Sequence, residues 1–254
     1  MTPSLVQYGL VGAAGMAAGM VNAIAGGGTL ISFPAMTAIG MPAVGANVTN
    51  TVALWPGMVG GILAQRRDFD GQRSRLALTV PIGALGGVAG GMLLLYTGEH
   101  VFRVIVPYLI LIAATLLATQ DRLKAWLVKH PHHERRTSPL ALGVPVAGGA
   151  VYGGYFGAGL GVILLAVLGL VLDDTLTRLN ALKQAIALAA NLAAALFFLF
   201  SGQVDWPIAL VVAAGAIAGG SIGGRFAGRI RPKTLRAIVV TLSVIVAGVY
   251  LVKG

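Results

Sequence analysis

The sequence contains no cysteine, only eight acidic residues, and no charged side chain before Arg66. The absence of cysteine excludes disulfide bonds, thiolate metal sites and a cysteine nucleophile. Charged residues make up about a quarter of an ordinary soluble domain, whereas they make up 10% of this chain. The long uncharged stretch at the start therefore excludes a soluble fold of ordinary composition.

Long apolar stretches separated by short polar breaks fill the sequence instead. A helix needs ~20 mainly apolar residues to cross a hydrocarbon core of about 30 Å. Backbone groups in lipid must be hydrogen-bonded internally, and the alternating pattern of a barrel is absent, so helices remain. We predict an all-α polytopic membrane protein in a lipid bilayer. The first apolar stretch follows no basic region and continues past Ala25, so we interpret it as a membrane helix rather than a signal peptide.

Basic side chains cluster in three of the polar breaks. They are Arg66, Arg67, Arg73 and Arg75; Arg122, Lys124, Lys129, Arg135 and Arg136; and Arg225, Arg229, Arg231, Lys233 and Arg236. The breaks at residues 97–100 and 201–205 contain neither Lys nor Arg. The positive-inside rule places the three basic breaks in the cytoplasm and the other two outside. We predict a multi-pass protein of the cytoplasmic (inner) membrane with both termini outside, and no nucleic-acid partner.

The chain resembles a tandem duplication. A shift of 133 residues aligns Gly86, Gly87, Gly90 and Gly91 with Gly219, Gly220, Gly223 and Gly224, Arg103 with Arg236, and Asn47 with Asn180. The break after the third apolar segment is basic in the first half and nearly neutral in the second, so the halves are predicted to be inverted. Two membrane repeats, residues 1–120 and 139–254, are then joined by a basic cytoplasmic linker at residues 121–138. Inverted repeats are typical of secondary transporters.

Histidines in the linker are the one candidate for metal ligands. His130, His132 and His133 could touch a metal, but we interpret residues 120–138 as a solvated loop. No metal and no cofactor are predicted.

Each repeat divides into about five apolar segments. They fall at residues 5–25, 29–39, 43–65, 76–96 and 101–119, and at residues 140–156, 160–172, 178–200, 206–224 and 234–252. The second segment of each five is too short to cross the bilayer upright, so it is predicted to be re-entrant or a broken helix hinged on glycine.

The two glycine-rich hinges are candidate anion sites. The first comprises Ala25, Gly26, Gly27, Gly28 and Thr29, and the second comprises Gly157, Ala158, Gly159, Leu160 and Gly161. A helix that begins at such a break points free N–H groups and its positive dipole end at a cavity. Tight packing or a kink is the alternative interpretation. The glycines at residues 86–91 and 219–224 are predicted to be packing faces.

Polar side chains on one helix face follow each hinge. Asn47, Asn50 and Thr51 share a face, and the shift of 133 residues maps them onto Asn180, Lys183 and Gln184. The candidate set also includes Asn22, Thr49 and Asn191. Amide groups and a lysine could hold an oxyanion. The alternatives are interhelical hydrogen bonds and a lysine that snorkels to the interface.

Carboxylates contribute little to this prediction. Asp173 and Asp174 could relay protons, but they are also typical of helix N-terminal caps at a membrane surface. Glu99 and Asp205 fall in predicted outer loops and are assigned no chemistry.

The stretch NAIAGGGTLISFPAM at residues 22–36, followed by IGMPAVGANVTNT at residues 39–51, resembles the signature of the sulfite exporter TauE/SafE family of permeases. The resemblance covers the whole chain, including GGYFGAGLGVILL and LNALKQ in the second half. It implies transport of a small sulfur-containing anion, such as sulfite or an organosulfonate, coupled to protons or another ion. The second hinge lacks the triple glycine, and Leu165 stands near where Pro34 would repeat. Carried over, the implied site comprises Asn22, the first hinge, the residue 47–51 cluster, and Asn180, Lys183 and Gln184.

The sequence therefore predicts a secondary transporter that works by alternating access. An anion channel would use the same parts. A membrane-embedded enzyme is disfavoured because the spans offer no histidine, no cysteine and no convincing carboxylate pair. An accessory subunit is the remaining alternative.

Overall fold

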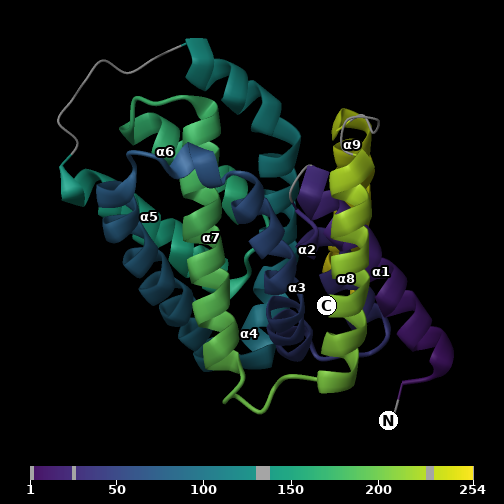
Figure 1. The fold of residues 1–254 in the computed structure, drawn as a ribbon. Coiled ribbons are helices and arrows are strands. Elements are labelled where there is room, and N and C mark those ends of the chain that lie inside the picture. The colour runs from purple at the N-terminus through teal and green to yellow at the C-terminus, as the bar shows by residue number, and fades with distance from the viewer. Residues whose placement is uncertain (1–2, 25–26, 130–137, 227–231, 254) are drawn as a thin grey trace.

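The computed structural model describes residues 3–24, 27–129, 138–226 and 232–253, and all of their regular secondary structure is helical (Figure 1). The helices are α1 (Leu5–Ile24), α2 (Thr29–Ala38), α3 (Ala43–Ala64), a 3₁₀ turn (Arg66–Phe69), α4 (Arg73–Lys129), α5 (Pro139–Tyr155), α6 (Leu160–Val171), α7 (Leu176–Phe198), α8 (Trp206–Phe226) and α9 (Pro232–Lys253). The prediction of an all-α fold is confirmed.

Helix α4 contains two of the predicted segments. Gly98 interrupts it with a non-helical backbone (φ 70°, ψ −179°), at the predicted break of residues 97–100. The second part of α4 continues to Lys129, so the first residues of the predicted linker are helical. The linker histidines lie outside the described residues.

Side-chain hydrogen bonds cap the first turns of α5 and α7. Ser138 Oγ accepts a hydrogen bond from the Leu140 N–H at the beginning of α5, where Pro139 occupies the first turn. Thr175 Oγ1 accepts from the Arg178 N–H in the same way at α7. These caps satisfy N–H groups that the helix itself leaves unpaired.

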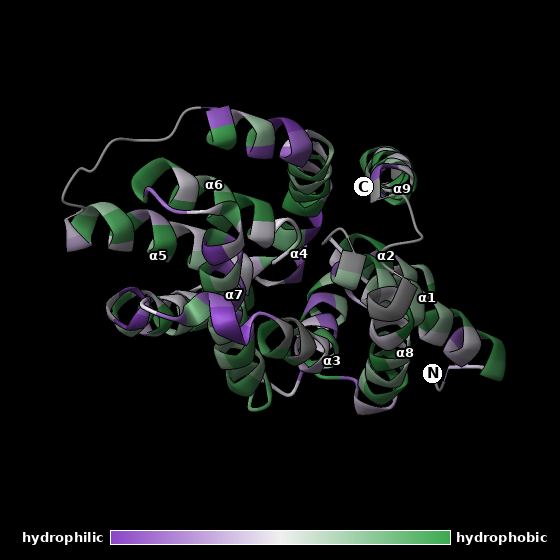
Figure 2. Cartoon of the chain, turned by 45° about the horizontal axis from the view of Figure 1, so that its top comes forward, coloured by the Kyte–Doolittle hydropathy of each residue, from purple (hydrophilic) through white to green (hydrophobic). Residues whose placement is uncertain are grey.

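Four helices in the described part of the chain are long and apolar enough to cross a membrane. They are α4, α7, residues Trp206–Gly223 of α8 and residues Lys233–Val252 of α9. Hydrophilic residues gather near helix ends, for example at the end of α4 and the beginning of α7 (Figure 2). These spans support the prediction of a multi-pass membrane protein.

The second segment of each half is a short helix, as predicted. Helix α2 has 10 residues and α6 has 12, so each rises only about 15 to 18 Å, roughly half of a hydrocarbon core. The Gln7 side chain at the start of α1 donates to the carbonyl of Ile39 just after α2, over 3.3 Å. Helix α2 therefore returns to the side from which α1 enters.

Helices of the first half pack against helices of the second half. Helix α1 packs most extensively against α8, and α4 packs against α5 and α7. A methyl group on Gly219 would collide with the Met16 carbonyl, and one on Gly87 would collide with the Ala190 carbonyl. Glycine thus permits close backbone approach at both contacts, which confirms the predicted packing faces.

Helices α3 and α7 are antiparallel neighbours. At one end, Asn180 Nδ2 donates to Gln65 Oε1 over 2.8 Å, which joins the start of α7 to the end of α3. At the other end, the N–H of Asp205, beyond α7, donates to Thr49 Oγ1 near the start of α3 over 3.0 Å. The two helices that carry the predicted polar faces therefore run in opposite directions.

Most arginines near helix ends gather at one end of the helix bundle. The end that we call the basic end carries Arg66, Arg67, Arg73, Arg75 and Arg178. The opposite end, which we call the Glu99 end, carries Glu99 and Asp205. The two carboxylate oxygens of Glu99 accept from the Ala43 and Val44 N–H groups over 2.6 and 2.8 Å, which caps α3.

Candidate functional site

The first glycine break is closed by an asparagine. Gly27 has a φ of 91°, and the N–H of Gly28 donates to Asn22 Oδ1 over 2.7 Å. A methyl group on Gly28 would collide with the carbonyl of Ala18. Glycine is therefore required where the chain reverses from α1 into α2, and the Asn22 side chain holds this reversal together.

A polar cluster lies beside this break, between α2 and α3. Ser32 Oγ donates to Asn50 Oδ1 over 2.5 Å, and Asn50 Nδ2 approaches Thr29 Oγ1 at 3.5 Å. Ser32 is 1% exposed and Asn50 is 2% exposed. The Asn50 amide is thus engaged on both of its atoms by side chains of α2, as the interpretation of interhelical hydrogen bonding expects.

The second break has a different construction. Gly157 and Gly159 have φ angles of 79° and 78°, and Gly159, the residue before α6, provides no side-chain cap. The Tyr152 hydroxyl donates to the Ala158 carbonyl over 2.6 Å and braces the turn. Two left-handed glycines therefore replace the triple glycine of the first half.

The first turn of α6 leaves one N–H group available. The N–H groups of Leu160, Val162 and Ile163 donate to the carbonyls of Gly157 and Gly159. Among the described residues, no acceptor is found for the N–H of Gly161. A free N–H at a helix N-terminus is a typical contact for an anion.

Lys183 lies next to this turn. Its Nζ donates to Asn180 Oδ1 over 2.6 Å, and a methyl group on Gly161 would lie 3.8 Å from the same nitrogen. The ion pairs found in the described part of the chain do not include Lys183. The Lys183 ammonium therefore lies beside the first turn of α6, and no carboxylate of the described residues pairs with it.

Several other predicted residues have structural partners. Asn47 is fully buried, and its Nδ2 donates to the Tyr155 carbonyl over 2.9 Å while its Oδ1 has no partner. Thr51 Oγ1 donates to the Asn47 carbonyl, and Asn191 Nδ2 donates to the Ala187 carbonyl. Asn47 thus joins α3 to the second break.

The remaining candidates are less engaged. Gln184 is half-buried on α7. Asn191 Oδ1 would lie 3.8 Å from a methyl group on Gly157, so this amide borders the second break. Gly26 lies outside the described residues.

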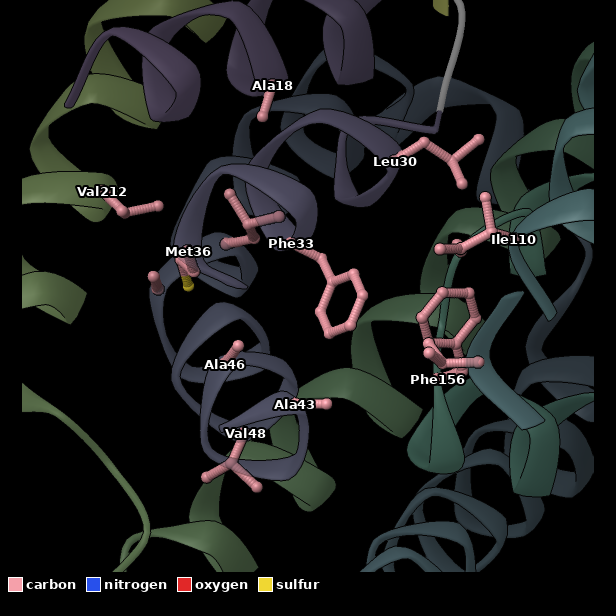
Figure 3. Close-up of a cluster of buried hydrophobic side chains, with 14 of the residues drawn as sticks. Ala18, Leu30, Phe33, Met36, Ala43, Ala46, Val48, Ile110, Phe156 and Val212 are labelled. Carbon is pink, nitrogen blue, oxygen red and sulfur yellow. The ribbon is translucent and has the colours of Figure 1, made fainter. Parts of the chain in front are cut away.

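Aromatic rings separate the two breaks. Phe33 of α2 points toward Phe156 of the second break (Figure 3), with ring centroids 5.6 Å apart and nearly perpendicular planes. Phe102 of α4 packs edge-on against Phe33 at 6.3 Å. All three side chains are almost fully buried, so the space between the breaks is filled with apolar side chains.

Six of the predicted site residues therefore fall into two clusters rather than one. The first is Asn22, Gly28, Thr29 and Asn50; the second is Asn180 and Lys183. Among the described residues, no hydrogen bond joins the two clusters. The sequence analysis did not single out Ser32 or Gln65, whereas Gly161 was part of the predicted second hinge. The position of Ser32, one turn after Thr29 on the short helix, was the available signal.

Asp174 belongs to an ion-pair cluster at the basic end. Its carboxylate accepts from the Arg75 guanidinium, and Arg178 Nε donates to its two oxygens over 2.9 and 3.1 Å. Partial burial raises the pKa of Asp174, but hydrogen bonds from Arg75, Arg178 and the Thr175 N–H outweigh it, so the pKa lies below its ordinary value of 3.8. Asp174 therefore ties α4 to α7 as a carboxylate.

Comparison with known proteins agrees with this architecture. The family model of the sulfite exporter TauE/SafE matches residues 11–251. A probable membrane transporter protein of Sinorhizobium sp, ORF9, is 30% identical over 91% of this chain and 87% of its own length. The probable membrane transporter protein YfcA of Escherichia coli strain K12 is 26% identical over 91% of this chain and 85% of its own length.

A probable membrane transporter protein of Haemophilus influenzae is 28% identical over 90% of this chain and 88% of its own length. No solved structure matches the chain. Because the family model spans nearly all of the sequence, including both breaks and both polar faces, the chain belongs to the sulfite exporter TauE/SafE family of membrane proteins.

Proposed function

We propose that this protein is a secondary transporter that moves a small sulfur-containing anion, such as sulfite or an organosulfonate, across the cytoplasmic membrane. The observation that carries the proposal is the Lys183 ammonium beside the uncapped start of α6, where the Gly161 N–H has no acceptor among the residues that the structure describes. Two positive groups that lie beside each other repel, and an oxyanion between them relieves that repulsion while it accepts hydrogen bonds from both.

The depth of this site suits a transported ion. Lys183 lies seven residues after Leu176, about 10 Å along α7 from its start, in a helix of 23 residues. The site is therefore well inside the bilayer, where an unpaired charge is costly and typical of a substrate pathway. Oxygen atoms of sulfite or a sulfonate match the donors that Lys183 and Gly161 offer.

Inverted repeats support alternating access as the mechanism. Helices α3 and α7 correspond in the shift of 133 residues and run antiparallel, which is the relation that an in-plane pseudo-twofold axis requires. The return of α2 to the side of α1 fits the same architecture. In this proposal the Phe33, Phe102 and Phe156 rings form the barrier that must separate when the two repeats rock.

Charge sets the proposed orientation in the membrane. The basic end, with Arg75 and Arg178, faces the cytoplasm, and the Glu99 end faces outside. Both termini then lie outside and the linker of residues 121–138 lies inside. Protons or another ion supply the gradient, and no catalytic step is part of this function.

Uptake of labelled sulfite into proteoliposomes that contain the purified protein tests this function, with and without an imposed proton gradient. Saturable uptake that the gradient drives above equilibrium supports a coupled transporter. Saturable uptake without accumulation above equilibrium would instead indicate a channel or a uniporter. Chemically altered sulfite in the lumen would indicate an enzyme, and no flux for sulfite or any organosulfonate would refute the proposal.

A further inference from the structure

A cavity lies at the Glu99 end of the helix bundle. It has a volume of about 480 Å³ and lies between α2, the second part of α4 and α9. Its polar lining side chains are Thr37, Arg103 and Tyr250, and Ile245, Val246 and Val249 of α9 form an apolar wall. The volume falls in the range of roughly 300 to 1,000 Å³ that is usual for pockets that hold small molecules.

Arg103 gives the cavity a positive charge. In the described part of the chain, no carboxylate lies within 4.0 Å of its guanidinium. Its counterpart in the second half, Arg236, donates instead to Asp121 over 2.5 Å. The two repeats thus share an arginine at this position, but Asp121, near the end of α4, pairs with the arginine of the second repeat.

The nearest acid on the same helix is already engaged. Glu99 lies one turn before Arg103, and its two oxygens accept from the Ala43 and Val44 N–H groups. Ala43 also lines the cavity, so the start of α3 is capped and does not compete for an anion there. The Arg103 guanidinium is the cationic group among the lining residues.

The apolar wall opens toward the lipid rather than the protein core. Ile245 is 57% exposed and Val249 is 47% exposed, although both line the cavity. In a membrane protein these side chains contact hydrocarbon, so the cavity is open laterally to the bilayer. A ligand with an apolar chain can enter it with the chain in contact with α9.

We propose that this cavity binds an anionic lipid of the leaflet at the Glu99 end. The lipid phosphate contacts the Arg103 guanidinium and the Tyr250 hydroxyl, and an acyl chain lies against Ile245, Val246 and Val249. Guanidinium groups bind phosphate oxygens in a bidentate geometry, and basic pockets between membrane helices recognise lipid head groups. This site is separate from Lys183 and does not depend on the transported anion.

Native mass spectrometry in a neutral detergent tests the proposal, with phosphatidylglycerol and phosphatidylcholine of identical acyl chains as probes. The wild-type protein should bind one phosphatidylglycerol at least tenfold more tightly than phosphatidylcholine. Loss of a charge-assisted hydrogen bond should weaken that binding by about tenfold to a hundredfold in Arg103→Gln. The matched control, Arg122→Gln, removes an exposed arginine from the other end of α4 and should retain wild-type binding.

A second variant leaves the charge in place. Val249→Trp fills the apolar wall and should reduce phosphatidylglycerol binding although Arg103 is present. Equal binding of the two lipids, or undiminished phosphatidylglycerol binding in both variants, would overturn the proposal. Glycerol 3-phosphate has the phosphate but no acyl chain, so it distinguishes a lipid ligand from a soluble phosphate. If it competes as strongly as the lipid, the cavity binds soluble anions and the lipid site is refuted.

Discussion

The Nζ atom of Lys183 lies 2.6 Å from Oδ1 of Asn180, one turn earlier on α7. Asn180 in turn donates from its Nδ2 to Gln65 of α3. The uncharged side chains of Gln65 and Asn180 thus position the Lys183 ammonium next to the start of α6. Neither of them neutralises its charge. The charge remains available to an anion, while its position is fixed from the end of α3.

The buried hydroxyl of Ser32 should matter for stability. In Ser32→Ala, Asn50 Oδ1 loses its donor in a site that is almost fully buried, which should lower the unfolding free energy by about 1 to 3 kcal/mol. Thermal unfolding in detergent measures this change. Thr115→Ala is the matched control, because Thr115 Oγ1 donates to its own helix at an exposed position. Equal melting temperatures for the two variants would contradict the assigned role.

Close helix packing at glycine predicts opposite effects at two positions. Gly87→Ala places a methyl group against the Ala190 carbonyl and should destabilise the protein by about 1 to 3 kcal/mol through overpacking. Gly148 of α5 has nothing within 4 Å of the added methyl group, so Gly148→Ala should be neutral or stabilise the helix. Melting temperatures report both changes. A Gly87→Ala protein as stable as the wild type would exclude the close approach of α4 and α7.

Acidification should weaken the contact between α4 and α7. The pKa of Asp174 is lower in the folded protein than in the unfolded chain, so its stabilising contribution is present above the unfolded pKa and is lost as the pH falls through the folded pKa. The wild type should therefore lose thermal stability below about pH 4. Asp174→Asn should be less stable at neutral pH and should lose less on acidification. Parallel pH profiles for the two proteins would contradict this contribution.

Apolar runs and their glycine breaks predicted the helices closely. The expected short segments at residues 29–39 and 160–172 are the helices Thr29–Ala38 and Leu160–Val171, because glycine and a drop in hydropathy mark helix ends locally. The break predicted near residue 98 is present within α4. The helix boundaries could thus be predicted because local sequence features, glycine and low hydropathy, determine them.

Partners of the polar residues could not be predicted in this way. The spacing of Asn47, Asn50 and Thr51 indicated one helix face, but Asn47 bonds a carbonyl 108 residues away, and Thr51 bonds its own helix. Thr49 receives the N–H of Asp205 from the far end of α7. Such pairs follow from how α3 meets α5 and α7, which helix periodicity does not specify.

The absence of cysteine makes the proposed orientation easy to test. Gln203→Cys and Ser74→Cys each introduce one thiol at an exposed position, near the Glu99 end and the basic end respectively. In intact spheroplasts, a membrane-impermeant maleimide should label Gln203→Cys, and Ser74→Cys only after lysis. The reverse pattern would invert the topology, and labelling of both would refute a separation of the two ends by the membrane.

The most direct test of the anion site is the affinity of labelled sulfite for purified Lys183→Met. Methionine keeps the length of the side chain but removes the charge and its hydrogen bonds, so sulfite should bind about tenfold to a hundredfold more weakly than in the wild type. Lys129→Met removes an exposed lysine at the end of α4 and should bind sulfite as the wild type does. A folded Lys183→Met protein with wild-type affinity would contradict the claim that Lys183 and the start of α6 hold the anion.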